Sequence, residues 1–462
     1  MPAIERPLWG SRVRAPLTDI AIELSSSTAA DLPLAVHDIV ASRAHVDELH
    51  RLGLVTDEGR ATLDAALAEI ANDIQSGAFT WSEAHEDVHM NVEAAVRHAV
   101  GPDLAGQLQA GRSRNEEVVT DERLWLLDAA RRLDDLLITM QRTLARRAEE
   151  ELSTALPAHT HTQPAQPVLL AHHLLAYVEM LDRDRQRLAD AAVRIDRSPA
   201  GSGAAVGSGL AIDRERVAQR LGFSGITANS LDAVADRDYA VEMVSAAAIA
   251  AGHLSRLAAD LVLWSTPYLR FAHISDGYAT GSSMLPNKRN PDIAELIRAR
   301  AARTNSALAS MLGILHGLPL GYHRDLQEMR APMLEAIGSL ELSLRAMDGM
   351  LAEVVFDREA MELAATSGNA LSTALAERLT RAGIPFRDAH WRVGELVALA
   401  ESRRCDLADL PDAELRELLP ELAGHPTVIP TLLEALEAVD LPGGTAPSRV
   451  REALHAVKER LA

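Results

Sequence analysis

Residues 121–152 contain neither proline nor glycine, and this uninterrupted run constrains the fold more than any other feature of the chain. Apolar side chains recur along it every three or four residues, as at Leu133, Leu137, Met140 and Leu144. The spacing predicts a single helix with one apolar face, roughly 45 Å long. Comparable patterns occupy four further stretches of the sequence: 167–195, 230–266, 291–318 and 327–354.

Five helices of this length indicate an all-α fold built on an elongated central bundle. The composition agrees, because 47% of the residues are hydrophobic but only 3% are aromatic, so the core must be aliphatic. Shorter helical patterns precede and follow the bundle. We therefore expect an N-terminal helical domain (1–111), the central bundle (112–356) and a C-terminal helical domain (357–462). Bundles of this length usually pair between subunits, so we also expect a homo-oligomer.

Charge and cysteine content exclude several classes of protein. The formal net charge is −20, which argues against a nucleic-acid partner. Cys405 is the single cysteine, so neither an intrachain disulfide nor a cysteine zinc site can form. The most apolar stretch, 244–265, is interrupted by His253, Arg256 and Asp260, and the N-terminal residues lack an apolar signal core. We expect a cytoplasmic protein with no membrane partner.

The loop Gly281–Pro291 holds one of only two lysines, Lys288 and Lys458, whereas the other 44 of the 46 basic residues are arginine. Because this chain uses arginine almost everywhere else, the lysine at position 288 indicates that a compact ammonium is needed there rather than a planar guanidinium. The surrounding glycine, serine and proline predict exposed backbone beside a rigid helix.

Three more polar clusters lie at predicted connections or in the helices: Gly111–Glu117, His159–Gln163, and Asp236–Asp238 inside the third long helix. Taken singly, each has an ordinary explanation as solvated charge, a hydrogen-bonded histidine, a surface ion pair or a plain linker. Together with Gly281–Pro291 they combine cations with hydroxyl and amide donors. That combination suits a small ligand that carries carboxylates.

Two catalytic patterns receive less weight. His85-Glu-Asp-Val-His89 matches the H-E-x-x-H zinc pattern, and its spacing can place both imidazoles on one helix face, but the sequence offers no clear third ligand. A serine hydrolase is disfavoured because no G-x-S-x-G follows a predicted strand. We expect neither a metal nor another cofactor.

The segment Thr280–Asp292 resembles the signature of the fumarase/aspartase superfamily, and the chain as a whole resembles its argininosuccinate lyase family. Further stretches carry the resemblance: Leu8–Arg12, Glu86–His89, Gly111–Asn115, Thr120–Trp125, Ala165–Pro167, His172–Tyr177, Asn229–Val234, Asp236–Asp238, Arg324–Glu328 and Pro385–His390. The resemblance implies a β-elimination that splits N-(L-argininyl)succinate into L-arginine and fumarate. It also implies a homotetramer with a twenty-helix core and active sites shared by three subunits.

The same resemblance implies roles for individual residues. Ser282 would be the base, Lys288 and Asn290 would bind the carboxylate that gathers charge, and His161, oriented by Glu295, would complete the acid side with Thr160. Further substrate-binding residues would be Asp31, Ser113, Arg114, Asn115, Arg237, Tyr322, Gln327 and Arg330.

Several positions depart from the family pattern. Glu116 and Glu117 follow Asn115 where the family has Asp-Gln, Thr162 replaces leucine, and Met329 replaces aspartate. Glu117 and Met329 put the identity of the amine product in question. Two alternatives therefore stay open: a related lyase that releases fumarate from a different N-substituted aspartate, and a non-catalytic structural homologue. The intact Ser282, Lys288, Asn290 and His161 argue against the second.

Overall fold

The computed structural model describes residues 17–82 and 84–462, so the Leu8–Arg12 motif lies outside the described part. The chain forms two compact units. The first unit comprises residues up to Arg132, Leu188–Ala246 and Asn305–Ile337. The second unit comprises Leu133–Arg187, Ala247–Thr304 and Gly338–Ala462.

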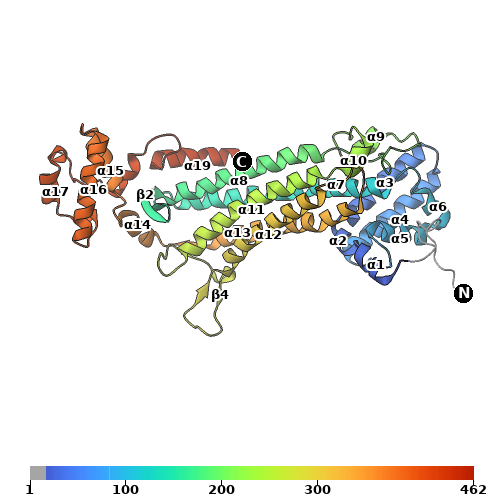
Figure 1. Ribbon diagram of the computed structural model, residues 1–462, viewed down its shortest axis with the longest axis horizontal. Coiled ribbons are helices and arrows are strands. Elements are labelled where there is room, and N and C mark those ends of the chain that lie inside the picture. The colour runs from blue at the N-terminus through green and yellow to red at the C-terminus, as the bar shows by residue number, and fades with distance from the viewer. Residues whose placement is uncertain (1–16, 83) are drawn as a thin grey trace. The chain divides into compact units, whose positions relative to one another are not determined.

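The five long helices are present, and the predicted all-α class is confirmed (Figure 1). They contribute residues to both units. Leu133, Leu137, Met140 and Leu144 of the first long helix are all fully buried, as their spacing predicted. The long helices are α7 (Arg114–Glu150), α8 (Leu170–Ile195), α11 (Asp238–Trp264), α12 (Asp292–Leu315) and α13 (Arg330–Glu353).

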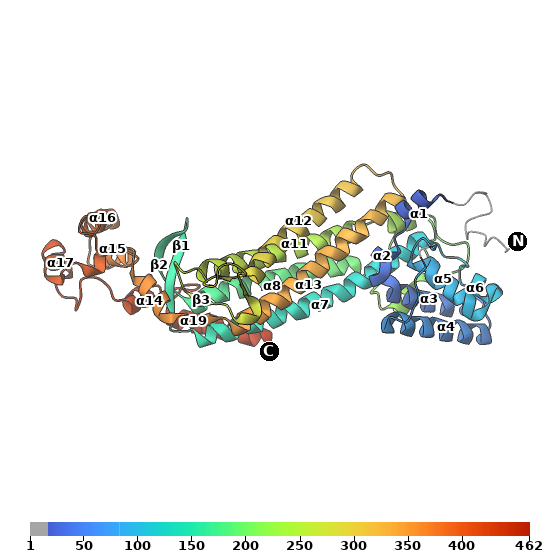
Figure 2. The same cartoon turned by 90° about the horizontal axis from the view of Figure 1, so that it is seen from below.

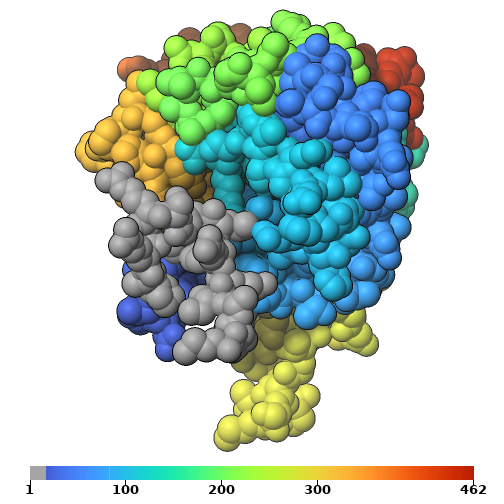
Figure 3. All heavy atoms as spheres, turned by 90° about the vertical axis from the view of Figure 1, so that its right-hand side faces the viewer, coloured from blue at the N-terminus to red at the C-terminus, as the bar shows by residue number. Residues whose placement is uncertain are grey.

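The N-terminal part of the first unit is a cluster of shorter helices, blue to cyan in Figure 3. Its core is aliphatic and includes Leu49, Leu63, Leu67 and Val96. The elements are α1 (Asp19–Ser25), α2 (Thr28–Asp31), the 3₁₀ turn η1 (Leu32–Leu34), α3 (Ala35–Arg51), α4 (Asp57–Ser76), α5 (Val88–Val100) and α6 (Pro102–Gln107).

Two short helices, α9 (Arg214–Leu221) and α10 (Ser230–Ala235), lie between α8 and α11 in the sequence and belong to the first unit. The prediction that Asp236–Asp238 lies inside a long helix is wrong. Asp236 has extended backbone (φ −61°, ψ 130°), and its Oδ1 accepts the N–H of Asp238 at 2.8 Å. The extended backbone at Asp236 ends α10, and its side chain then accepts a backbone N–H at the start of α11, as aspartate commonly does at helix starts.

In the part of the chain that the structure describes, short strands form three two-stranded antiparallel sheets. A hairpin of β1 (Ala155–Thr160) and β2 (Gln163–Leu169) leads into α8 (Figure 2). The other pairs are β3 (Ala272–His273) with β6 (Val355–Phe356), and β4 (Thr280–Gly281) with β5 (Arg289–Asn290). The 3₁₀ turns η2 (Asp276–Tyr278) and η3 (Arg324–Met329) complete the connections.

The C-terminal helices of the second unit have their own core, which includes Leu375, Leu379, Leu415 and Leu422. The elements are α14 (Arg358–Thr366), α15 (Ser372–Arg381), α16 (Phe386–Ser402), η4 (Leu407–Asp409), α17 (Asp412–Leu418), η5 (Pro420–Leu422), α18 (Leu432–Glu437) and α19 (Pro447–Leu461). The division into three domains stays a prediction.

Among the described helices, α11 alone is long and apolar enough to cross a membrane. Half of its most apolar window is buried in the protein. Its polar side chains also have partners, since His253 bonds Asp184 at 2.7 Å and Asp260 accepts from Tyr177 at 2.7 Å. We therefore interpret α11 as a core helix.

Candidate active site

The signature segment forms a loop that is closed at its base by the β4–β5 pair (Figure 1). Within it, the Ser282 Oγ accepts two backbone hydrogen bonds, from the N–H of Met284 at 3.3 Å and of Leu285 at 3.0 Å. Two donors aimed at one hydroxyl oxygen stabilise negative charge on it. The loop therefore supplies, from its own backbone, part of what a serine base needs.

Side chains hold the base of this loop in place while its tip stays exposed. Arg289 binds both the Asp276 carboxylate and the Ile274 carbonyl, and Thr280 donates to Asp292. Lys288 is exposed, and no carboxylate within the described chain pairs with its ammonium. An unpaired cation six residues from Ser282, in the same loop, is suited to an anionic ligand.

The predicted His161 cluster lies at the tip of the β1–β2 hairpin rather than directly before a helix. His161 and Thr162 form the two-residue turn, with left-handed backbone at φ 55° and 59°. Thr160, His161 and Thr162 are all exposed. Glu295 lies in the first turn of α12, 3.8 Å from Arg298, and no hydrogen bond or ion pair joins it to His161 in the described chain.

In the first unit, Asp31 and Arg330 bind each other instead of standing free. Arg330 Nη1 lies 2.5 Å from the Asp31 Oδ1, and Ser27 donates to the Asp31 Oδ2 at 2.5 Å. Burial raises the pKa of Asp31, while Arg330 acts in the opposite direction. This pair is fully interior, at 0% and 3% side-chain exposure.

Glu122 lies between Arg237 and Arg330 and so connects Arg237 to the Asp31–Arg330 pair. The sequence analysis did not identify Glu122 as a site residue. Glu122 Oε2 lies 2.9 Å from Arg237 Nε and accepts from the Tyr239 hydroxyl at 2.7 Å, while its Oε1 lies 3.9 Å from Arg330 Nε. Arg237 Nη2 is buried without a hydrogen-bond partner among the described residues. A buried guanidinium nitrogen that is left over in this way suits a further anion. Tyr322 is near enough to interact electrostatically with Arg237 and Arg330, and burial raises its pKa.

Ser113, Arg114 and Asn115 form the entry to α7, also in the first unit. The Ser113 Oγ accepts the Asn115 N–H at 3.3 Å, and Arg114 lies 3.2 Å from Asp87. Gln327 of η3 donates to the Ser25 carbonyl at 3.2 Å. The polar composition of Gly111–Glu117 marked the turn at Ser113–Asn115 in the sequence, whereas the resemblance to the lyases was the only signal for Gln327.

The two departures at Glu117 and Met329 are interior. Glu117 pairs with Arg112 at 2.9 Å, and the exposed fractions of these two side chains are 6% and 8%. Arg112 also donates to the Ser42 hydroxyl at 2.9 Å. Met329 is buried as well. Both departures therefore lie in the interior of the first unit, as Asp31, Arg237 and Arg330 do.

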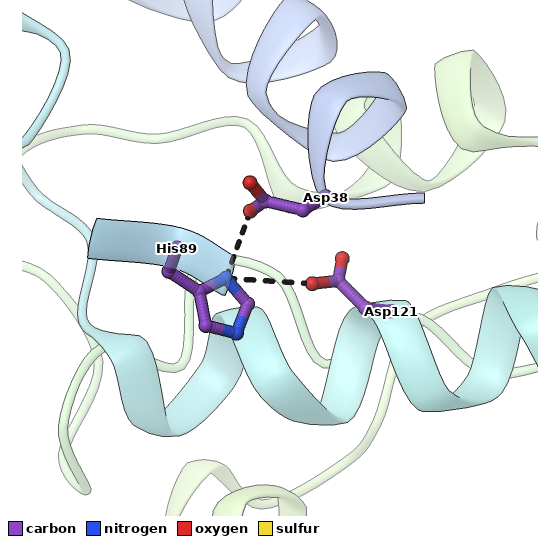
Figure 4. Close-up of side chains that lie close together, drawn as sticks. All are labelled: Asp38, His89 and Asp121. Carbon is purple, nitrogen blue, oxygen red and sulfur yellow. Dashed lines mark hydrogen bonds and ion pairs between the residues drawn. The ribbon is translucent and has the colours of Figure 1, made fainter. Parts of the chain in front are cut away.

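His85 and His89 do not share a helix face, although the spacing of the H-E-x-x-H pattern allows it. α5 begins at Val88, because the Asp87 carboxylate caps it by accepting the Met90 N–H at 2.8 Å, and His85 precedes the helix. His89 instead meets Asp38 and Asp121 (Figure 4).

This trio has the donor set of a metal site, but its geometry is that of an ion cluster. His89 Nδ1 lies 3.0 Å from Asp38 and 3.7 Å from Asp121. Burial alone would lower the pKa of His89, but Asp38 raises it to about 10. Burial raises the pKa of Asp121. The imidazolium therefore occupies the position between the carboxylates that a metal cation would need.

The comparisons with known proteins identify the family. A family model described as Lyase matches residues 15–305, more than half of the chain. The chain belongs to this lyase family. A second model, described as argininosuccinate lyase C-terminal, matches residues 369–439 of the lyase.

Solved structures give this lyase its fold relatives. EDDS lyase matches it with a TM-score of 0.81, both as a variant with bound fumarate (25% identity) and in complex with formate (26% identity). Each match covers 96% of this chain and 88% of the other. Class II fumarase from Schistosoma mansoni shares the fold at 17% identity and a TM-score of 0.73, over 88% of this chain and 89% of that one.

The predicted site residues of the lyase divide between its two compact units. Asp31, Arg237, Tyr322, Gln327 and Arg330, with the Ser113–Asn115 turn, belong to the first unit. The second unit carries the loop with Ser282, Lys288 and Asn290, the hairpin tip with Thr160 and His161, and Glu295. The roles assigned to these residues stay predictions.

Proposed function

We propose that this lyase releases fumarate from an N-substituted aspartate by β-elimination, with N-(L-argininyl)succinate as the leading substrate. The observation that carries the proposal is the Ser282 oxygen, held by two backbone N–H groups in a loop whose Lys288 has no carboxylate partner in the described chain. The matched C-terminal domain model and the fumarate bound to the EDDS lyase variant support it.

The reaction needs a base, an anion site and an acid. Ionised Ser282 removes a proton from the carbon next to one carboxylate, and the electron pair left behind is spread into that carboxylate. Lys288 and Asn290 stabilise the added charge. That electron pair then forms the C=C bond of fumarate as the C–N bond breaks. The electrons of the C–N bond stay on nitrogen, and a proton supplied from the His161 side completes the amine.

The serine pair in the loop provides a matched test of the base. Ser282→Ala should reduce fumarate release by at least about 1000-fold, because no other group would take the proton. Ser283→Ala, at the next residue, should keep turnover within about threefold of the wild type. Wild-type turnover in Ser282→Ala would exclude this assignment.

A second substrate class is favoured by one observation, the interior departures at Glu117 and Met329. A panel that compares argininosuccinate with other N-substituted aspartates, ethylenediamine disuccinate included, separates the candidates. Equal amounts of arginine and fumarate from argininosuccinate support the leading proposal. Fumarate from a different panel member alone would support the related lyase, and none from any member would oppose both.

A further inference from the structure

Four side chains of the first unit hold the glycine-rich loop 200–209 at five of its residues. Arg214 of α9 donates to the Ala200 carbonyl at 2.9 Å and to the Ser202 hydroxyl at 3.2 Å. Asn115 donates to the Ala204 carbonyl at 3.0 Å. Ser230 donates to the Ala205 carbonyl at 3.0 Å, and Gly203 donates to Glu116 at 2.7 Å.

The backbone of this loop is tightly folded. Gly203 has φ +59°, and a Cβ there would lie 2.6 Å from the Gly207 carbonyl oxygen. The Gly207 N–H in turn donates to the Ser202 carbonyl at 2.7 Å. Only glycine fits at residue 203, so the anchors hold one defined conformation and not a loose linker.

Glu116 joins this loop to the turn that carries Ser113, Arg114 and Asn115. Its Oε1 accepts the Ser113 N–H at 3.3 Å, the backward bond of a capping box, and its Oε2 accepts the Gly203 N–H at 2.7 Å. Each carboxylate oxygen thus holds one element. A carboxylate can accept both bonds, whereas a protonated carboxyl or an amide has one oxygen fewer to accept with.

We propose that Glu116 is a positioning residue for the substrate-binding turn 113–115, and that its ionised carboxylate fixes this turn and loop 200–209 together. The proposal rests on the proposed function of that turn and goes beyond it, because it adds a pH-sensitive control of substrate binding. Asn115 shares in it, since its side chain donates to the same loop.

The surroundings of Glu116 raise the pKa of its carboxyl to near neutral pH. The side chain is 3% exposed, and burial raises its pKa to about 7, with Glu117 acting in the same direction. The cations that face it are Arg112, which precedes α7, and Arg214 of α9. Above neutral pH both hydrogen bonds are available, and below it one of them is lost.

The kinetic test compares wild type, Glu116→Gln and Glu93→Gln from about pH 5.5 to about pH 8.5. Glu93 is the matched control, because burial also raises the pKa of this carboxyl beside Arg114 and Arg112, although among the described residues no hydrogen bond links it to the loop. In the wild type, KM should fall as pH rises through about 7, with kcat little changed. Glu116→Gln should keep, at every pH, a KM about tenfold above the alkaline wild-type value, so that the variant and the wild type converge at acidic pH.

Two outcomes would overturn the proposal. One is a Glu116→Gln variant whose KM depends on pH as in the wild type. The other is a Glu93→Gln variant whose KM no longer depends on pH, which would indicate general electrostatics rather than the Glu116 link between the turn and the loop. A retained profile in Glu93→Gln together with a flat one in Glu116→Gln supports it.

A second measurement does not depend on the substrate. Hydrogen–deuterium exchange of the full-length chain should be about tenfold faster in peptides that cover 200–209 in Glu116→Gln than in wild type at alkaline pH. Unchanged exchange in these peptides refutes the Glu116 link between the turn and the loop, even if fumarate is released. Faster exchange without fumarate release from any substrate means that the proposed function fails, while the Glu116 link between the turn and the loop is supported.

Discussion

At the scale of single residues, the charged groups of this lyase fall into two kinds. Asp31, Arg237 and Arg330 are interior and bind protein partners, whereas Lys288 is exposed and stands without one in the described chain. Interior pairs mainly fix geometry, because breaking them leaves a buried charge. An exposed, unpaired cation contributes little to stability and is free for a ligand.

Lys288 therefore should matter for activity and not for folding. Lys288→Met should lower kcat/KM for fumarate release by at least about 100-fold, because the carbanion loses its charge partner. The unfolding temperature should change by less than about 2 °C. Lys458→Met, at the only other lysine, is the control; it removes a surface pair with Glu149 and should leave kcat/KM unchanged. Equal losses in both variants would contradict this role.

The His89 cluster predicts a pH dependence of stability. The pKa of His89 is raised to about 10 in the folded chain, so folding favours its protonated form. The stabilisation is complete below the ordinary histidine pKa near 6.5 and is lost as pH rises through about 10. It is on the order of 5 kcal/mol at pH values below that window.

Urea unfolding at fixed protein concentration near pH 7 and near pH 10 tests this sign. His89→Gln should lower the free energy of unfolding by several kcal/mol near pH 7 and by much less near pH 10. His37→Gln is the control, because the Asp128 partner of His37 has 47% of its side chain exposed. A loss in His89→Gln that is the same at both pH values would contradict the cluster.

At this scale, the sequence predicted the exposed site residues better than the contacts of the interior ones. Ser282 and Lys288 lie in one short segment whose composition marks it. The partners of His89 come from α3 and α7, and Glu122 meets Arg237 from 115 positions away in the sequence. Such contacts depend on how helices pack, and no local pattern encodes them.

At the scale of elements, the interiors of the long helices were predictable and their ends were not. An apolar period of 3.6 residues repeats over many turns, so a few residues that depart from it do not change the prediction of a helix. An end depends on a single side-chain bond, such as the one that Asp236 makes to the Asp238 N–H. The β1–β2 hairpin was missed because its prolines, Pro157, Pro164 and Pro167, weaken a strand pattern.

The hairpin turn carries conformational strain that a substitution can relieve. Thr162 is β-branched at φ 59°, a region that asparagine tolerates better. Thr162→Asn should raise the free energy of unfolding by up to about 1 kcal/mol. Gln166→Asn, an exposed change within β2, should not raise it. Thermal unfolding of both variants measures the difference, and a less stable Thr162→Asn would show that the threonine hydroxyl, bound to the His161 carbonyl at 2.6 Å, matters more.

At the scale of the whole molecule, the long helices expose large apolar side chains that a solitary chain would leave in water. Ile249 and Leu263 of α11, Leu296 and Leu312 of α12, and Leu342 of α13 are 40% to 56% exposed. Apolar residues on long helices favour association with further copies. We therefore propose the homotetramer implied by the family, with active sites assembled from several subunits.

Mixed oligomers test that proposal. Asn115→Ala and Ser282→Ala, from the first and the second unit, should each be inactive in fumarate release. If each site takes these residues from different subunits, co-expression should restore about a quarter of wild-type activity, because random assembly leaves that share of sites intact. Light scattering should give the mass of a tetramer. No recovery in mixed tetramers would place both residues of a site in one chain.

The backbone origin of the two hydrogen bonds to Ser282 has a consequence for how this lyase can diversify. The donors are the N–H groups of Met284 and Leu285, and every residue type except proline provides such a group. The side chains at these positions, 86% and 47% exposed, are therefore not tied to the chemistry. Mutation can change them freely, which makes positions 284 and 285 places where new substrate preferences can be selected without loss of the reaction itself.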